Sequence, residues 1–342
     1  MKILQVIDTL NIGGAERVFV DMSNILLENS QKIEVLFLLE CGVLKPELNQ
    51  NIKIHELNRS KKWSLKKMKE CGEVLKTFDI IHCHFRHVYR YISLVNTIFP
   101  FKGKVILHDH YGAIDVDQKI PFLFSTFFQP NYYIGVSKTL TLWAEKKLSI
   151  PTKNVFLLEN IIIKNDVELK KERNYDFILV SNIKPVKNNI FAVKLAQKMD
   201  KSLLLVGQNQ DSNYFTKINN ATTEKITINS TISNAQSVMY WADFGLHTSI
   251  SETGPLVLIE YLAKKLPFLA FETGEVAKTL KNYFPLYFID NFDLEQWQER
   301  INKIKEMPVD YAKFDLVFEK EFGSKNYCQK LKAIYLCILN KT

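Results

Sequence analysis

The stretch Trp241–Glu275 constrains the fold of this 342-residue chain more than any other part of its sequence. Two short apolar runs, Phe244–Ile250 and Pro267–Phe271, are separated by a polar turn and by a helical segment that opens near Pro255. Apolar runs of this length on either side of a helix are typical of buried parallel strands. The stretch therefore predicts a strand–turn–helix–strand unit of an α/β sheet.

The turn of this unit has the composition of an anion-binding site. We expect Ser251 and Thr253 to cap the helix and Pro255 to occupy its first position, where a missing amide proton costs nothing. Free amide groups and the positive end of the helix dipole both favour an anion at a helix N-terminus. The candidate ligands of a phosphate group are the residues of this helix start: Thr253, Gly254, Pro255, Leu256 and Val257.

Two carboxylates flank the helix start. Glu252 comes directly before it, and Glu260 follows after seven intervening residues. A carboxylate repels a phosphate but accepts hydrogen bonds from the hydroxyl groups of the molecule that carries the phosphate. Glu252 would then accept hydrogen bonds from the hydroxyl groups of a sugar, and Glu260 from those of a ribose. The spacing alone equally fits a loop carboxylate at Glu252 and an i,i+4 partner of Lys264 at Glu260.

Strands and helices alternate in both halves of the chain. Strands are expected over Lys2–Ile7, Ile33–Leu39, Ile52–Leu57, Asp79–His84, Lys104–Leu107, Asn131–Val136, Phe177–Val180 and Leu203–Val206. Helices are expected over Ala15–Leu27, Ser60–Lys76, Thr139–Leu148, Ile190–Met199, Val276–Phe284, Leu294–Lys305 and Ser324–Asn340. The charged stretch Lys164–Asn174 is the best candidate for a linker. We therefore predict an α/β protein of two Rossmann-like parallel-sheet domains that face a ligand cleft.

Further candidate residues follow other predicted strands. Gly13 and Gly14 lie in the loop after the first strand, where an absent Cβ lets the backbone approach a ligand, although by itself such a Gly pair is more often a plain turn. Lys184 and Lys187, in the loop after Val180, are candidate diphosphate ligands or ordinary surface lysines.

Five of the seven histidines fall in two segments, at positions 82, 84, 87, 108 and 110. The i,i+2 spacing of His82 with His84, and of His108 with His110, puts each pair on one face of a strand. Imidazole pairs of this kind can bind a metal, but no nearby carboxylate or thiolate completes a recognisable ligand set. We expect no metal site.

The motif Ser-Glu-x-Gly-Pro-x-x-x-x-Glu, with its flanking WAD and LPFLAFETGEVA, resembles the E-x7-E signature of the retaining GT-B glycosyltransferases of family GT4. The sequence GGAE at residues 13–16, HDHYG at 108–112 and the Pro-x-Lys-Asn run ending at Asn188 resemble further motifs of that family. The resemblance covers nearly the whole chain. It implies an N-terminal acceptor-binding domain over residues 1–165, a nucleotide-sugar (donor) domain over 166–323, and a final helix, 324–342, that returns to the first domain.

The resemblance also implies roles for individual residues. Glu252 would lie at the donor hexose and Glu260 at the nucleotide ribose, with His110 or His108 as the active-site histidine. Gly13, Gly14, Lys184 and Lys187 would lie at the donor phosphates. The implied activity is metal-independent, retaining transfer of a hexosyl unit from a nucleotide-diphosphate sugar, with a UDP-sugar favoured and no cofactor. The acceptor would be a sugar or a lipid-linked glycan of cell-envelope polysaccharide, lipopolysaccharide or capsule.

One motif departs from the family. The commoner form has Gly and Arg where this chain has Ser181 and Asn182, so Lys184 must supply the second positive charge. Two alternatives therefore stay open: a non-catalytic GT-B partner subunit, and a sugar-nucleotide 2-epimerase of the same fold. Transfer of a glycosyl group would distinguish a glycosyltransferase from both alternatives.

The net charge of +8 permits an anionic substrate, an anionic membrane or nucleic acid. No zinc-finger, RNP or basic-zipper pattern is present, so we expect no nucleic-acid partner. The basic stretch Ser60–Lys76, with Trp63 among its lysines, fits either a solvated helix or a helix on an anionic membrane surface. Five scattered cysteines and the absence of a signal-like N-terminus suit a cytoplasmic protein. The basic helix and the family resemblance imply peripheral binding to the inner face of the cell membrane.

Overall fold

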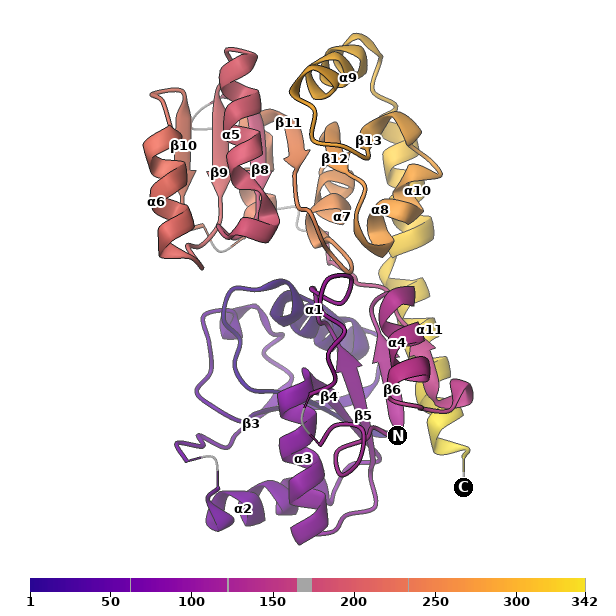
Figure 1. The fold of residues 1–342 in the computed structure, drawn as a ribbon. Helices are drawn as coiled ribbons and strands as arrows, with labels where there is room; N and C mark the ends of the chain where they lie inside the picture. The colour runs from indigo at the N-terminus through magenta and orange to yellow at the C-terminus, as the bar shows by residue number, and fades with distance from the viewer. Residues whose placement is uncertain (62, 122, 165–173, 233, 342) are drawn as a thin grey trace. The chain divides into compact units, whose positions relative to one another are not determined.

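The computed structural model describes residues 1–61, 63–121, 123–164, 174–232 and 234–341, and its chain forms two compact units (Figure 1). The first unit contains Met1–Ile162 together with Gly323–Thr342, and the second contains Ile163–Phe322. From the sequence we predict domain boundaries after residues 165 and 323. Most of the expected linker, residues 165–173, lies outside the described residues.

The first unit is built on a seven-stranded sheet in the order β3-β2-β1-β4-β5-β6-β7, and all its strand pairs are parallel. The strands are β1 (Lys2–Ile7), β2 (Lys32–Phe37), β3 (Lys53–Glu56), β4 (Ile80–His84), β5 (Lys104–Asp109), β6 (Tyr132–Gly135) and β7 (Val155–Leu157). Every side chain of β4 is buried, because parallel sheets are covered on both faces.

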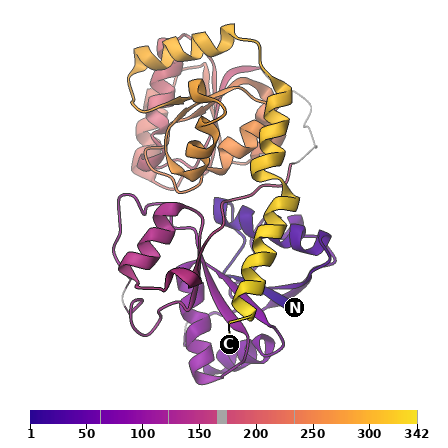
Figure 2. The ribbon, with the colours of Figure 1, turned by 90° about the vertical axis from the view of Figure 1, so that its right-hand side faces the viewer.

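Helices cover both faces of this sheet. They are α1 (Gly14–Glu28), α2 (Leu65–Leu75), α3 (Arg86–Ile98), α4 (Lys138–Lys147) and α11 (Ser324–Leu339), with 3-10 turns at Lys45–Glu47 and Thr152–Asn154. Helix α11 packs against α1, so the last helix of the chain belongs to the first unit (Figure 2). Its buried face includes Tyr327, Leu331 and Tyr335.

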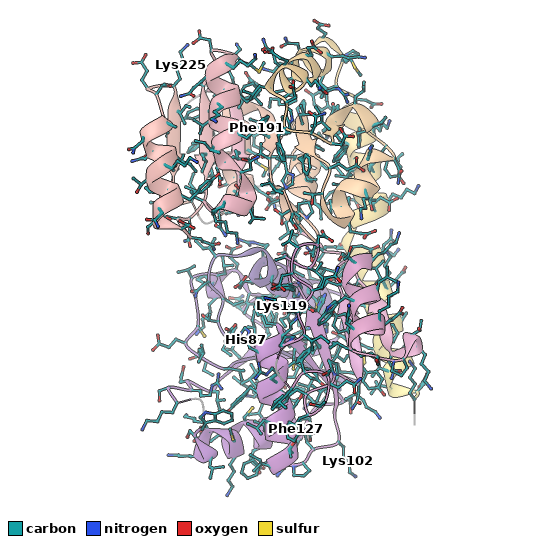
Figure 3. All side chains as sticks on the ribbon, in the orientation of Figure 1. His87, Lys102, Lys119, Phe127, Phe191 and Lys225 are labelled. Atoms are coloured by element: carbon teal, nitrogen blue, oxygen red, sulfur yellow. The ribbon has the colours of Figure 1, made fainter. Side chains whose placement is uncertain are left out.

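The second unit has a six-stranded parallel sheet in the order β10-β9-β8-β11-β12-β13. The strands are β8 (Tyr175–Val180), β9 (Leu203–Val206), β10 (Ile226–Asn229), β11 (Ala242–His247), β12 (Phe268–Phe271) and β13 (Phe288–Ile289). The helices are α5 (Asn189–Lys198), α6 (Ser212–Ala221), α7 (Leu256–Ala263), α8 (Gly274–Lys281), α9 (Leu294–Glu306) and α10 (Tyr311–Phe322), with 3-10 segments at Pro185–Lys187, Ala235–Trp241 and Pro285–Tyr287. In its core, Phe191 of α5 packs edge-on against Trp297 of α9 (Figure 3).

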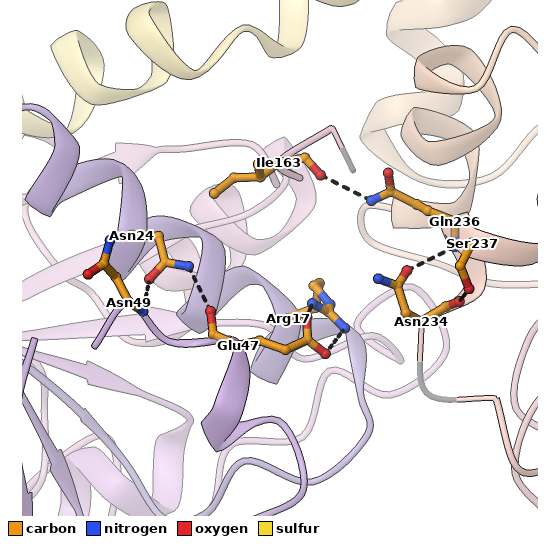
Figure 4. A network of polar contacts seen from close by, with 8 residues as sticks. All are labelled: Arg17, Asn24, Glu47, Asn49, Ile163, Asn234, Gln236 and Ser237. Atoms are coloured by element: carbon orange, nitrogen blue, oxygen red, sulfur yellow. Dashed lines mark hydrogen bonds and ion pairs between the residues drawn. The ribbon is translucent and has the colours of Figure 1, made fainter. Parts of the chain in front are cut away.

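Side-chain bonds anchor the ends of each unit's elements. In the first unit, the Arg17 guanidinium pairs with the Glu47 carboxylate, and Asn24 Nδ2 donates to the Glu47 carbonyl at 2.9 Å (Figure 4). In the second unit, Gln236 Nε2 donates to the Ile163 carbonyl at 3.1 Å. The first contacts hold α1 against the 3-10 turn Lys45–Glu47, and the last ties the beginning of the second unit to the 3-10 segment Ala235–Trp241.

Both sheets have the strand order that predicts a ligand site. In each sheet, the first three strands are added toward one edge and the later strands toward the other. The order therefore switches between β1 and β4 in the first unit and between β8 and β11 in the second. Loops that leave neighbouring strands at this point diverge, and ligands bind at the carboxyl ends of the strands there. The expected pair of Rossmann-like domains is thus confirmed.

The main differences from expectation concern helices. Helix α2 begins at Leu65 rather than Ser60, because the Ser64 side chain accepts from the Lys67 amide and caps it. Trp63 precedes this helix, and residue 62 lies outside the described residues. Helices α3, α6 and α10 were not expected, since polar and aromatic residues interrupt their apolar spacing. None of the helices among the described residues is long and apolar enough to span a membrane.

Candidate functional site

The second unit brings two predicted segments together at the carboxyl edge of its sheet. The loop after β8 contains Lys184 and Lys187, and the loop after β11 contains Glu252. Thr248 Oγ1 donates to the Lys187 carbonyl at 3.0 Å, and the Ile250 amide donates to Val186 at 2.8 Å. These bonds hold the two loops side by side, as the adjacency of β8 and β11 requires.

Lys187 and Glu252 form an ion pair through Lys187 Nζ and Glu252 Oε1. Their side chains are 18% and 15% exposed. His247, the last residue of β11, is buried with its Nε2 at 3.7 Å from the same carboxylate oxygen. Burial by itself raises the pKa of Glu252, but the attraction of Lys187 and the His247 ring outweighs it and holds that pKa well below its ordinary value. Glu252 is therefore a carboxylate at every physiological pH.

Lys184 adds a second ammonium group at this edge. Burial and the neighbouring charge of Lys187 lower the pKa of Lys184, while Glu252 raises it. Two lysines beside one carboxylate leave a net positive charge in a partly desolvated place. Such an arrangement favours an anionic ligand, because ammonium groups bind phosphate oxygens as point charges.

The helix start after Glu252 is organised differently from the sequence prediction. Pro255 is the N-cap residue of α7 rather than its first helical residue, and no side chain caps the helix. Ser251 and Thr253 are therefore not the caps that we expected. Thr253 and Pro255 are buried, as is Gly254 between them, whereas Leu256 and Glu260 are partly exposed.

A second turn supports this helix start. The Glu252 amide donates to Thr273 Oγ1 at 3.1 Å, and the Glu275 amide donates to the Thr253 carbonyl at 2.8 Å. Gly274 has φ +81°, and a Cβ on it would lie 2.7 Å from Pro255 Cδ. Only glycine adopts this conformation at low cost, so Gly274 is required for the close contact of the two turns.

In the first unit, Gly13 and Gly14 lie at the carboxyl edge, after β1. Gly13 is the N-cap of α1 with extended backbone, its carbonyl accepts from the Arg17 amide at 3.0 Å, and Gly14 is exposed. A Cβ on Gly13 would lie 2.9 Å from Cδ of Glu16. Burial, together with the charge of Asp8, raises the pKa of Glu16.

Four histidines gather beside this edge, on β4 and at the end of β5. The rings of His82 and His84 stack with centroids 4.9 Å apart, which confirms that they share one face, and His108 and His110 lie 4.2 Å apart. His87 is separate: it lies on α3, is mostly exposed, and bonds Asp8 Oδ2 at 2.8 Å (Figure 3). Burial lowers the pKa of His82 and of His110 to about 3, and it holds the pKa values of His84 and His108 well below their ordinary range. The four rings are neutral at physiological pH.

Nitrogen atoms of His82, His84 and His108 lie within 4.8 Å of one another, so these three rings are the best candidate metal ligands among the described residues. The rings of His82 and His84 are nearly parallel, at an interplanar angle of 14°, and the group contains no carboxylate or thiolate.

The structure distinguishes the two candidate histidines of β5. His108 is fully buried, and neither of its ring nitrogens has a partner among the described residues. His110 is partly exposed and bonds His84 Nδ1 through Nε2 at 3.1 Å. This difference favours His110 as the residue that contacts a ligand.

Three residues near these sites were missed in the sequence. Gln5 bonds His84, the Tyr335 hydroxyl bonds His82 Nδ1 at 2.6 Å, and His247 lies beside Glu252. Gln5 could have been found as the one polar residue inside the apolar run Ile3–Ile7. Tyr335 occupies an ordinary apolar position of its helix, and the sequence contains no signal of its hydroxyl contacts.

Comparison with known proteins finds a family match over the second unit. Residues 161–316 match the model of the family described as glycosyl transferases group 1. This part of the chain is similar to a group 1 glycosyltransferase domain. A search among curated proteins finds no match.

Solved structures resemble the whole chain. A glycosyltransferase from Rickettsia africae ESF-5 is 18% identical, with a TM-score of 0.76 over 100% of this chain and 99% of that one. HepE from Anabaena, in complex with UDP and glucose, is 14% identical, with a TM-score of 0.76 over 97% and 98% of the two chains. The lipopolysaccharide outer core galactosyltransferase WaaB is 13% identical, with a TM-score of 0.67 over 98% and 99%. At these identities the likeness establishes the fold, which is GT-B.

Proposed function

We propose that this protein is a retaining glycosyltransferase, of the GT4 kind, that moves a hexosyl unit from a nucleotide-diphosphate sugar to a sugar or lipid-linked glycan. The observation that carries the proposal is the cluster of Lys184, Lys187 and Glu252 at the carboxyl edge of the second unit's sheet. It joins positive charge for a diphosphate with a permanently ionised acceptor for sugar hydroxyls. UDP is the favoured nucleotide, because HepE, a protein of the same fold, was solved with UDP and glucose.

The proposed chemistry breaks the bond between the anomeric carbon and the diphosphate and forms one from that carbon to the acceptor oxygen. Lys184, Lys187 and the amides at the start of α7 stabilise the leaving diphosphate, so no divalent metal is needed for this step. The leaving phosphate oxygen takes the proton of the acceptor hydroxyl on the same face of the sugar, which preserves the anomeric configuration.

The remaining residues position the donor. Glu252 accepts from hexose hydroxyls, and Glu260 accepts from ribose hydroxyls. His110 contributes a neutral ring to the hexose site, and the Gly13–Gly14 turn lets the backbone approach the ligand. Because Lys187 pairs with Glu252, a diphosphate must share Lys187 with Glu252 or displace that carboxylate.

The first test is thermal stabilisation by UDP, GDP, ADP and CMP in the presence of EDTA. We expect one diphosphate to raise the melting temperature of the wild type and to have little effect on Glu260→Ala. Glu295→Ala, which removes an exposed carboxylate of α9, is the control and should keep the full shift. If no nucleotide stabilises the wild type, the donor site is wrong and a non-catalytic partner subunit becomes the better interpretation.

Turnover separates the remaining alternatives. A transferase consumes a UDP-hexose only when an acceptor is present and forms a product of unchanged anomeric configuration, which nuclear magnetic resonance reports directly. A 2-epimerase would convert the UDP-hexose without an acceptor. The proposed acceptors are glycans of cell-envelope polysaccharide, lipopolysaccharide or capsule, so a panel of such oligosaccharides is the natural substrate set.

We also propose that the first unit binds the anionic inner face of the cell membrane. Trp63, which precedes α2, and Leu65, its first residue, are 67% and 64% exposed among the lysines of that segment. Phe127 is 56% exposed and, with Lys102, is drawn toward the same end of the first unit as α2 (Figure 3). Exposed apolar side chains among cations fit insertion between anionic headgroups.

Sedimentation with lipid vesicles tests this contact. Vesicles rich in phosphatidylglycerol should bind the wild type, and a Trp63→Ser, Leu65→Ser variant should bind them more weakly. Leu316→Ser, which changes an equally exposed leucine of α10, should bind as the wild type does. Equal binding of all three proteins would exclude α2 as the membrane contact.

A further inference from the structure

A chain of hydrogen bonds leads from the last helix of the protein to His110. Gln5 Nε2 lies 3.0 Å from the Tyr335 hydroxyl, and Gln5 Oε1 lies 2.6 Å from His84 Nε2. His84 Nδ1 then lies 3.1 Å from His110 Nε2. The side chains of Gln5, His84 and Tyr335 are fully buried, so water does not compete for these bonds.

Chemistry determines the orientation of the Gln5 amide. The Gln5 atom that faces Tyr335 also lies 3.3 Å from Met22 Sδ, and a thioether sulfur accepts hydrogen bonds but does not donate them. The amino group must therefore point toward Met22 and Tyr335. The carbonyl oxygen of Gln5, which only accepts, is left facing His84.

This orientation decides where the histidine protons lie. Since Gln5 Oε1 only accepts, His84 must carry its proton on Nε2, and its Nδ1 is a bare acceptor because the ring is neutral. His84 Nδ1 in turn requires a proton on His110 Nε2. His110 Nδ1, which has no partner among the described residues, is then an unprotonated acceptor.

We propose that Gln5 is a positioning residue that, held by Tyr335 of α11, fixes both His84 and His110 in the Nε2-protonated tautomer. The C-terminal helix thereby determines which nitrogen of His110 accepts a hydrogen bond. The tautomer is a property of the first unit. In this tautomer, His110 Nδ1 would accept a hydrogen bond from a hydroxyl group of the hexose, and that role rests on the proposed glycosyl transfer.

Nitrogen-15 resonances of labelled histidines test the tautomers directly, because protonated and bare ring nitrogens differ widely in chemical shift. We expect both His84 and His110 of the wild type to carry their protons on Nε2 at neutral pH, and His84→Gln and His110→Gln variants assign the signals. A proton on Nδ1 of either ring in the wild type would overturn the proposal. So would displacement of the His82, His84 and His108 signals by one equivalent of zinc, since a metal would then replace the hydrogen bonds.

Substitutions on the chain of bonds test the role of Gln5. Gln5→Met removes the acceptor for His84 and should convert His84 and His110 to mixed tautomers, whereas Gln5→Glu keeps that acceptor and should preserve them. Tyr335→Phe should loosen the Gln5 orientation and shift the His84 and His110 signals. Tyr327→Phe is the matched control, because Tyr327 is buried on the same helix and its hydroxyl has no hydrogen-bond partner among the described residues. If Gln5→Met fails to fold, comparison of the histidine signals in Tyr335→Phe and Tyr327→Phe still tests whether Tyr335 and Gln5 fix the tautomers.

Kinetics give the second measurement. Gln5→Met should lower kcat by between about twofold and tenfold, the loss expected for one misdirected hydrogen bond, and Gln5→Glu should restore part of it. Unchanged tautomers in Gln5→Met and Tyr335→Phe would refute the positioning role. Correct tautomers in a wild type that transfers no sugar would instead refute the proposed function and leave the tautomer assignment standing.

Discussion

The carboxyl edges of the two sheets carry side chains of different charge, although both sheets have the same kind of strand order. In the first unit the edge is lined by four neutral imidazoles, of which three are buried, and two of these bond Gln5 or Tyr335. In the second unit it holds two lysines and a carboxylate that remains ionised. A shared topology therefore places the site, and the residues at the strand ends decide whether it suits uncharged hydroxyl groups or a charged diphosphate.

The largest expected difference between the two edges is their response to acid. The folded pKa values of His82, His84, His108 and His110 lie below the ordinary value of 6.5, so the unfolded chain binds protons that the folded chain excludes. Stability is then complete above about pH 6.5 and falls as the pH drops below it, by at most about 1.4 kcal/mol per pH unit for each ring and about 5.6 kcal/mol per pH unit for four. Urea unfolding between pH 8 and pH 5 measures this slope.

A variant separates the two edges in this experiment. His108→Gln removes a ring that makes no hydrogen bond among the described residues, and should reduce the slope by about a quarter. Glu252 has a pKa below its ordinary value of 4.5, so its contribution is complete above that pH and is lost only as the pH falls below it. Stability that stays constant between pH 6.5 and pH 5 would show that the folded histidines take up protons over the same range as in the unfolded chain, so that their pKa values are not lowered.

Glu252→Gln tests the charge of the second edge. We expect kcat to fall by about 10²–10³, the loss typical of one preorganised electrostatic contact at a reacting centre. Glu272→Gln, which removes the carboxylate paired with Lys281 in the neighbouring turn, should retain most of the activity. Equal rates for the wild type and Glu252→Gln would mean that the carboxylate serves the fold rather than the reaction.

Nucleotide affinity should respond to the two partners of the ion pair in opposite directions. Lys187→Met removes a charge-assisted contact and should weaken UDP binding by about tenfold. Glu252→Gln frees Lys187 and should leave UDP binding as tight or tighter. Isothermal titration calorimetry measures both, with Lys201→Met, whose partner is Asp176, as the control. Weaker UDP binding by Glu252→Gln would place the phosphates away from Lys187.

The smallest expected effect concerns the turn that supports the helix start. Gly274→Ala should lower the free energy of unfolding by about 1–2 kcal/mol, because alanine at positive φ is strained and its Cβ would contact Pro255. Gly112→Ala is the control, since a Cβ there meets no atom within 4 Å. Chemical denaturation compares the two variants, and equal stability would show that the turn adjusts without strain.

Local sequence patterns were sufficient for most of the strands and most of the helices, and they singled out Lys184, Lys187 and Glu252. The short strands β7, β10 and β13 were not expected. β1 and β9 span the predicted residues, because short apolar runs bounded by polar turns have few other ways to be buried. Helix ends were less certain. Ser64, rather than a residue near Ser60, precedes and caps α2, and Pro255 is the N-cap residue of α7. Helix ends depend on single hydrogen bonds that several neighbouring residues can make.

Contacts between distant residues were decided only by the tertiary structure. The motif around Glu252 and the lysines of the other loop are separate in sequence, and their ion pair exists because β8 and β11 are neighbours in the sheet. Gln5 and Tyr335 are 330 residues apart, and their bond exists because α11 packs on the first unit. Apolar periodicity predicts which face of an element is buried, but only the packing of whole elements determines which polar groups meet there.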